Sequence, residues 1–143
     1  MVAEAEYPDV PRESDVRAAL GRILATAKFR ACPRLTSFLR FAVEATLEGR
    51  GHRLKGYTIG VEALGRCESF DPQIDPIVRV EATRLRRALL NYYAGEGARD
   101  PLVIDIPLGH YIPTFRPRAS IPVAATLPKW LKTLRVIGRS LRV

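Results

Sequence analysis

Hydrophobic residues recur with a helical period in three segments of the chain, at residues 14–29, 33–48 and 76–94. This period gives each helix one apolar face, so each segment predicts an amphipathic helix that packs into a core. Ser14 suits the capping position of the first helix, and Pro33 opens the second where proline is favoured. Asp75 suits the cap of the third helix, with Pro76 as its first residue.

Between the second and third predicted helices the periodic segments are short, and turn-forming residues are frequent. GHRLKG, residues 51–56, predicts a brief strand or a turn. Residues 57–64 predict a short helix that ends at Gly65, although Gly60 lowers its helix propensity. Residues 65–75 form a connecting loop, in which Asp71-Pro72 marks a turn.

After the third helix the hydrophobic period changes from helical to alternating. LVIDI at 102–106 and YIPTF at 111–115 flank the turn sequence PLGH, which predicts a β-hairpin. Pro107 and Pro113 are expected at strand ends or on an edge. The order of elements predicts an α+β fold that is mostly α: a winged helix-turn-helix with a three-helix core, a C-terminal β-hairpin wing and an extra N-terminal helix.

Charge is distributed unevenly along the chain. The formal net charge is +8, but residues 1–115 carry only +1, and residues 116–143 contain seven basic and no acidic residues. We expect a loose acidic N-terminus at 1–13, the winged-helix domain at 14–115, a proline-rich linker at 116–128 and a basic amphipathic helix at 129–143. The overall charge therefore describes the tail more than the domain.

The long helix predicted at 76–94 separates its arginines from its apolar residues. Val78, Leu85 and Leu89 lie on the core side, together with Ala82, Tyr92 and Tyr93. On the opposite side Arg79, Thr83 and Arg87 form a row that Val80, Arg84 and Asn91 flank, with Glu81 away from the row and Arg86 at its border. A solvated helix face usually mixes charges of both signs. A row without an acid favours contact with an anion, since the arginine fork suits phosphate oxygens and the guanine edge.

Residues 129–143 predict a helix with apolar side chains on one face and only cations on the other. This distribution is typical of membrane-surface helices and calmodulin targets, so contact with an anionic membrane surface is one interpretation. An ordinary packing helix with a solvated face and additional DNA-backbone binding are the alternatives. The residues of this surface are Trp130, Lys132, Leu134, Arg135, Ile137, Arg139 and Leu141.

The segment SFDPQIDPIVRVEATRLRRAL and the hairpin LVIDIPLGHYIPTF resemble the last helix and wing of OmpR/PhoB-type winged-helix effector domains. The helix pattern V-x-V-x-x-x-R-L-R-x-x-L is matched from Val78 to Leu89, and the wing pattern is matched by Gly109, Tyr111 and Phe115. Residues 54–93 are also similar to an N-terminal winged-helix module of bacterial multidomain regulators. In those proteins a membrane segment, tetratricopeptide repeats or a nucleotide-cyclase domain follows. The N-terminal four-stranded sheet and the second wing glycine of OmpR-type domains have no counterpart here.

The resemblance implies that helix 76–94 enters the major groove of double-stranded DNA. It also implies that the hairpin 102–115 lies by the adjacent minor groove and that the helix 57–64 crosses the backbone. In this family the loop before the long helix often contacts the transcription machinery, which suggests RNA polymerase as a further partner. The expected DNA-binding residues are Arg79, Val80, Thr83, Arg84, Arg87, Lys55, Tyr57, Thr58 and His110.

We therefore expect a DNA-binding module of a bacterial transcriptional regulator, without enzyme activity. The two histidines are far apart in sequence, and no His/Cys/carboxylate cluster has metal-ligand spacing, so neither a metal nor a cofactor is expected. Cys32 and Cys67 are expected to be reduced cytoplasmic thiols. No run of about 18 apolar residues is present that would span a membrane.

A second hypothesis is a non-DNA signalling or protein-interaction module, tethered at the membrane surface by the basic tail. The net charge of +1 over residues 1–115 favours it, because dedicated DNA-binding domains are usually more basic. A homodimer is compatible with the first hypothesis, because a single module of this size buries little DNA.

Overall fold

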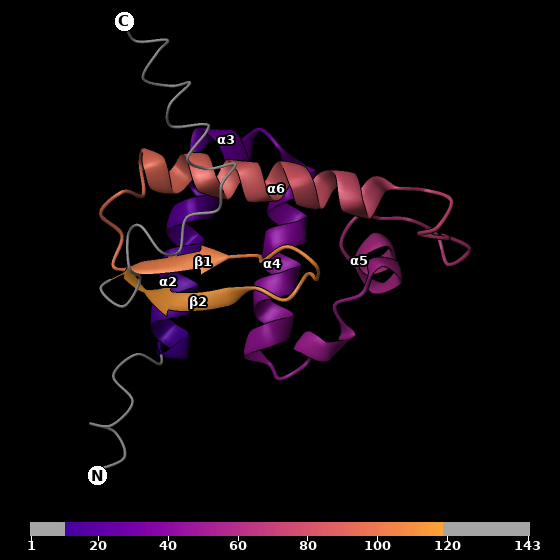
Figure 1. The fold of residues 1–143 in the computed structure, drawn as a ribbon, viewed down its shortest axis with the longest axis horizontal. Helices are drawn as coiled ribbons and strands as arrows, with labels where there is room; N and C mark the ends of the chain where they lie inside the picture. The colour runs from indigo at the N-terminus through magenta and orange to yellow at the C-terminus, as the bar shows by residue number, and fades with distance from the viewer. Residues whose placement is uncertain (1–10, 119–143) are drawn as a thin grey trace, which may run out of the picture.

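The computed structural model describes residues 11–118, which form an α+β fold that is mostly helical. Within these residues there are five α-helices, one 3₁₀ turn and one two-stranded antiparallel sheet (Figure 1). In chain order the elements are α2 (Glu13–Leu24), α3 (Ala27–Arg30), α4 (Pro33–Leu47), η1 (Gly51–Arg53), α5 (Gly56–Glu62), α6 (Ile77–Ala94), β1 (Leu102–Asp105) and β2 (Thr114–Pro117).

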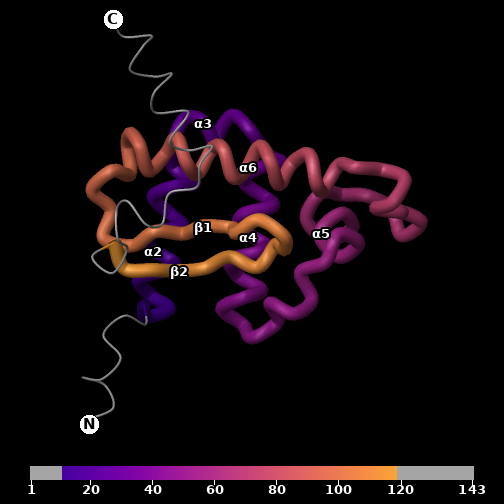
Figure 2. The backbone as a smooth tube through the Cα atoms, viewed as in Figure 1, coloured from indigo at the N-terminus to yellow at the C-terminus, as the bar shows by residue number. Residues whose placement is uncertain are grey.

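The long helix α6 runs across the upper ends of α2 and α4, and the β1–β2 hairpin lies below it in Figure 1. The tube in Figure 2 follows the same path and shows α5 beside the start of α6, beyond α4. Helices α4, α5 and α6 pack against one another, while β1 contacts both α2 and α6. A single cluster of buried apolar side chains fills the centre; its largest fully buried members are Phe29, Phe38, Ile23, Leu35, Leu39, Ile59, Leu85, Leu89, Ile104 and Ile106.

The N-terminal helix differs from the sequence prediction at both ends. It begins at Glu13, and Arg12 occupies the capping position without a side-chain hydrogen bond, so the expected cap at Ser14 is wrong. The helix also stops at Leu24, where the Thr26 hydroxyl donates to the Ile23 carbonyl. Thr26 has an extended backbone, and the four-residue helix α3 follows, with Phe29 buried. The helix predicted over 14–29 is therefore two helices, and the second of them places Phe29 in the core.

Helix α4 confirms its prediction, with Pro33 as the first helical residue. It ends before Gly49, whose φ of 81° lets the Arg50 amide donate back to the Ala45 carbonyl. The next residues form the 3₁₀ turn η1, so of the two options for residues 51–56 the turn is observed. Helix α5 follows one residue earlier than expected.

Helix α6 begins at Ile77, with Pro76 in the capping position, one residue later than predicted. Asp75 still serves the start of the helix, because its Oδ1 accepts a hydrogen bond from the Ile77 amide at 3.1 Å. Its other oxygen, Oδ2, lies 3.2 Å from Nε of Arg66 in the preceding loop.

The hairpin is confirmed, with Leu102 opposite Pro117 and Asp105 opposite Thr114. Its second strand lies later than the predicted YIPTF segment and extends two residues into the region expected to be linker. The reason is a long connection over residues 106–113, which includes Gly109 at a φ of 99°. Pro113 directly precedes β2, in agreement with its expected place at a strand end.

Candidate functional site

The exposed side of α6 carries a basic ridge, which we define as Arg79, Val80, Thr83 and Arg87. All four side chains are exposed, and Val80 retains 49% of its accessible surface. The Thr83 hydroxyl donates to the Arg79 carbonyl at 3.1 Å within the same helix. Neither guanidinium of the α6 ridge has a carboxylate partner or a hydrogen bond within residues 11–118. The predicted separation of arginines from the core face is confirmed.

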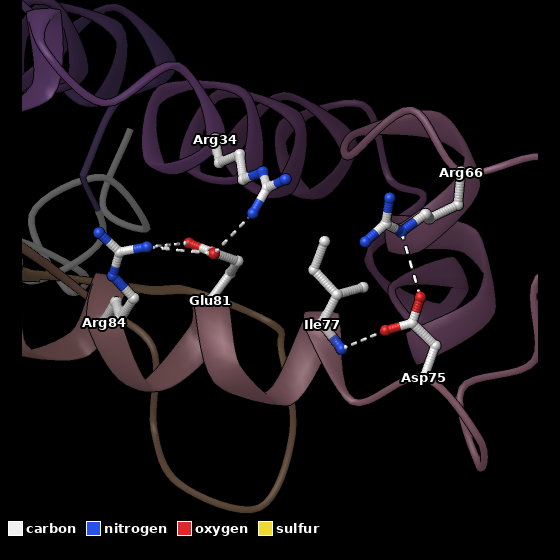
Figure 3. A network of polar contacts seen from close by, with 6 residues as sticks. All are labelled: Arg34, Arg66, Asp75, Ile77, Glu81 and Arg84. Carbon is white, nitrogen blue, oxygen red and sulfur yellow. Dashed lines mark hydrogen bonds and ion pairs between the residues drawn. The ribbon is translucent and has the colours of Figure 1, made fainter.

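Arg84 differs from the α6 ridge because it is paired with a neighbouring acid, Glu81. Glu81 lies away from the α6 ridge, as expected, but its side chain is buried, with 2% of its surface accessible. Its carboxylate contacts Nη1 of Arg84 at 3.2 and 3.4 Å, and Nη1 of Arg34 at 3.5 Å (Figure 3). Sequence reasoning missed Arg34, although an acid placed toward the core of a helix implies a nearby cation.

Arg86 joins α6 to the hairpin. Its Nε donates to the Ile106 carbonyl at 2.9 Å, and its Nη2 donates to the carbonyls of Pro107 and His110 at 3.3 and 3.0 Å. A guanidinium can serve three carbonyls because its N–H groups project in a fixed plane. The residue expected at the border of the row is therefore the one that fixes the connection between the strands.

His110 lies exposed in that connection, as its predicted role requires. Its Nδ1 accepts a hydrogen bond from the Ile112 amide at 3.1 Å, which leaves Nε2 available to a partner. Leu108 is also exposed, next to Gly109. The end of the hairpin thus presents one imidazole and one apolar side chain to solvent.

The three residues predicted at the start of α5 have unequal exposure. Lys55 directly precedes the helix and is exposed, while Thr58 is half-buried. Tyr57 keeps 43% of its surface, and its hydroxyl donates to the Glu68 carbonyl at 2.8 Å. Tyr57 therefore also holds the loop that leads to α6.

Residues 11–118, which the structure describes, carry a higher net charge than residues 1–115, the range considered from the sequence. Residues 11–118 contain eighteen Lys or Arg and twelve Asp or Glu, a formal net charge of +6. Three acids precede residue 11, and Arg116 and Arg118 belong to the hairpin end rather than to a separate tail. The predicted membrane or partner surface, Trp130 to Leu141, lies outside the described residues.

A second polar cluster lies where the C-terminal end of α6 meets the hairpin. The Tyr92 hydroxyl donates to Oδ2 of Asp100 at 2.5 Å, and Arg22 lies 3.3 Å from the other carboxylate oxygen. Arg118 donates to the carbonyls of Asp100 and Gly97 and lies over the ring of Tyr93. Burial, followed by the hydrogen bond with Asp100, raises the pKa of Tyr92 to about 12. Burial also raises the pKa of Tyr93.

The remaining candidates for reactive or metal-binding groups in residues 11–118 are few. Cys32 and Cys67 are free thiols, and the hydrogen bond with Ser69 lowers the pKa of Cys67. No group of three or more His, Cys, Asp or Glu side chains in residues 11–118 could hold a metal ion. No helix in this part of the chain is long and apolar enough to cross a membrane.

Comparisons with protein-family models, curated proteins and solved structures find no match for the chain.

Proposed function

We propose that the chain is a DNA-binding module of the winged-helix type, in which α6 enters the major groove. The observation that carries the proposal is the α6 ridge, where Arg79 and Arg87 are exposed and have no anionic partner among the described residues. Guanidinium groups match phosphate oxygens and the O6 and N7 atoms of guanine. The exposed methyl groups of Val80 suit apolar contact with a thymine methyl.

The arrangement of the elements supports this assignment. Three mutually packed helices, α4, α5 and α6, precede an antiparallel hairpin, which is the order of a winged helix. Arg86 holds the end of the hairpin against the flank of α6. Exposed His110 would then lie over the minor groove next to the groove that α6 enters, and Lys55 and Tyr57 would contact the backbone.

Charge supports the same proposal. The net charge of +6 over residues 11–118 removes most of the objection raised by the +1 of residues 1–115. Phosphate contacts supply much of the affinity of proteins for DNA and all of their non-specific affinity. The α6 ridge would add base contacts to this background and so provide sequence selectivity.

The decisive experiment is selection from a random duplex pool followed by sequencing, with wild type and with Arg79→Ala/Arg87→Ala. The matched control is Arg40→Ala/Arg99→Ala, which also removes two exposed arginines that have no polar partner within residues 11–118, but from α4 and from the loop after α6. We expect an enriched motif for wild type and control, and its loss in the α6 variant. Absence of a motif in wild type, or its survival in the α6 variant, would refute the proposal.

A protein-interaction module is the second candidate function, and the loop between α5 and α6 favours it. Ile74 in this loop is 81% exposed, and the loop is hollowed between Arg66, Phe70 and Asp75. RNA polymerase or another protein could contact this surface while α6 stays free. Ile74→Ser would then abolish the function and Arg79→Ala/Arg87→Ala would preserve it. Recruitment to anionic vesicles by the tail would instead require Trp130 and Leu134.

A further inference from the structure

Two arginines from different helices share one buried carboxylate beside the α6 ridge (Figure 3). Arg34 comes from the first turn of α4, whereas Arg84 and Glu81 belong to α6. Both guanidinium groups approach the carboxylate through Nη1, at 3.5 Å from Arg34 and at 3.2 Å from Arg84. Glu81 therefore fixes the positions of two cations that lie far apart in the sequence.

The cluster has an excess of positive charge and of hydrogen-bond donors. One carboxylate faces two guanidinium groups, so one positive charge remains uncompensated. A guanidinium has five N–H donors, and the contacts with Glu81 use only Nη1 of each arginine. The side chains of Arg34 and Arg84 remain 57% and 53% exposed, although Glu81 is buried. The unused donors can therefore reach an anion in solution.

The cluster lies on a defined side of the α6 ridge. Arg84 and Arg86 are two residues apart, so their side chains leave α6 in roughly opposite directions, about 200° apart. Arg86 points to the hairpin and Arg84 points to the start of α4. The α6 ridge thus lies between the hairpin on one flank and the Arg34–Arg84 pair on the other.

We infer that Arg34 and Arg84, held by Glu81, bind a phosphodiester oxygen of the DNA backbone on the flank of α6 away from the hairpin. This inference rests on the proposed function and adds α4 to the DNA-binding surface. A phosphodiester carries one negative charge, which matches the uncompensated charge of the pair, and forked donors suit its oxygens. Glu81 acts as a positioning residue, because it orders both side chains before the phosphate arrives.

The test measures the affinity of the full 143-residue chain for a random-sequence duplex at several salt concentrations. Arg34→Ala should weaken binding by about three- to tenfold and make the log–log salt slope less negative by about 0.9, the loss of one phosphate contact. Arg40→Ala removes the same charge from an exposed position further along α4, and it should leave the slope nearly unchanged. Equal slopes in both variants would overturn the inference.

Two further variants keep the test decisive. Arg34→Lys retains the charge and should retain most of the salt slope, so it serves if Arg34→Ala does not fold. Glu81→Gln separates positioning from simple charge, since removal of a negative charge alone should raise the affinity for DNA. The positioning role predicts a lower affinity in Glu81→Gln, and a higher affinity in a variant that is folded by circular dichroism would contradict it.

Failure of the inference and failure of the proposed function give different results. If Arg79→Ala/Arg87→Ala weakens binding and Arg34→Ala does not, only the inference is overturned. If neither affects binding, both fail. A parallel experiment measures the thermal stability of the chain in inorganic phosphate at constant ionic strength. Thermal stabilisation by phosphate that is lost in Arg34→Ala, with an unchanged DNA slope, would assign the pair to free phosphate and overturn its assignment to DNA.

Discussion

The ring of Phe70 lies directly against Gly60. A Cβ atom at Gly60 would be 2.3 Å from Cε2 of Phe70 and 2.7 Å from its Cδ2, well inside contact distance. Phe70 comes from the loop between α5 and α6, and this packing buries it. Gly60 therefore weakens α5 as a helix former but allows the loop to close onto the helix.

Gly60→Ala should destabilise the domain. The added methyl group forces the ring of Phe70 to move, which costs about 1–3 kcal/mol and exceeds the helix-propensity gain of up to about 1 kcal/mol. Denaturant unfolding measures the difference. Gly21→Ala is the control, because nothing lies within 4 Å of a Cβ there and Gly21 sits inside α2. That variant should be more stable than wild type, and equal effects at the two glycines would contradict the packing argument.

Arg86→Ala should release the hairpin from α6. Three hydrogen bonds from a charged donor are lost, so the free energy of unfolding should fall by about 2–3 kcal/mol. Hydrogen exchange should accelerate in the paired strands β1 and β2 more than in α4. Arg86→Lys should recover little, because a compact ammonium group cannot span three carbonyls.

The neighbouring arginine provides the comparison for this prediction. Arg87 is exposed and makes no hydrogen bond or ion pair within the described residues, so Arg87→Ala should change stability by less than about 0.5 kcal/mol. Under the proposed function it should nevertheless weaken DNA binding. Similar stability losses in both variants would show that the contacts of Arg86 with the hairpin contribute nothing in solution.

Alkaline pH should destabilise the domain through Tyr92. Its pKa of about 12 exceeds the ordinary value near 10, so the unfolded chain loses the phenolic proton first and stability falls as pH rises from about 10 to 12. This stabilisation is fully present below about pH 10. Tyr92→Phe should be less stable at neutral pH and show a shallower alkaline decline. Parallel pH profiles for the two proteins would contradict the assignment.

Cys67 should react with iodoacetamide faster than Cys32 near neutral pH. Its side chain is exposed, and its Sγ lies 2.9 Å from the Ser69 hydroxyl, the main cause of its lowered pKa. The thiolate is the reacting species, so a lower pKa increases the rate near neutral pH. Ser69→Ala should slow the labelling of Cys67 and leave that of Cys32 unchanged, as measured by mass spectrometry. An unaltered Cys67 rate would exclude a role for the hydroxyl.

Salt should weaken DNA binding steeply under the proposed function. If about four to six phosphates are neutralised, the log–log slope of affinity against salt concentration should lie near −4 to −5. A chain truncated after Arg118 reports the slope of the described domain, because the basic residues from Lys129 onward are removed. A slope near zero in that protein would place the binding in the tail.

The sequence predicted those parts of the fold that follow from a periodic pattern. The core face of α6, its exposed arginines, the start of α4 at Pro33 and the presence of a hairpin are all confirmed. Each depends on the spacing of neighbouring residues, which is local information. The order of helices followed by a hairpin was also predicted from the pattern, but the interactions between their side chains were not.

The errors occurred where distant residues decide the outcome. The helix predicted over 14–29 breaks at Thr26, and Phe29 in the next short helix is buried in the core. Strand β2 begins only at Thr114, after a long connection whose carbonyls accept hydrogen bonds from Arg86. Arg34 was missed for the same reason, since its partner Glu81 lies forty-seven positions away. No periodic pattern along the chain encodes these contacts.

The contacts of Arg86 also set a mechanical property of the exposed surface. Because one guanidinium is hydrogen-bonded to the carbonyls of Ile106, Pro107 and His110, the spacing between α6 and the end of the hairpin is constrained. A partner that touches both must therefore match one fixed spacing, and it has to deform where it does not match. The domain would then distinguish partners by their shape and stiffness as well as by their chemical groups.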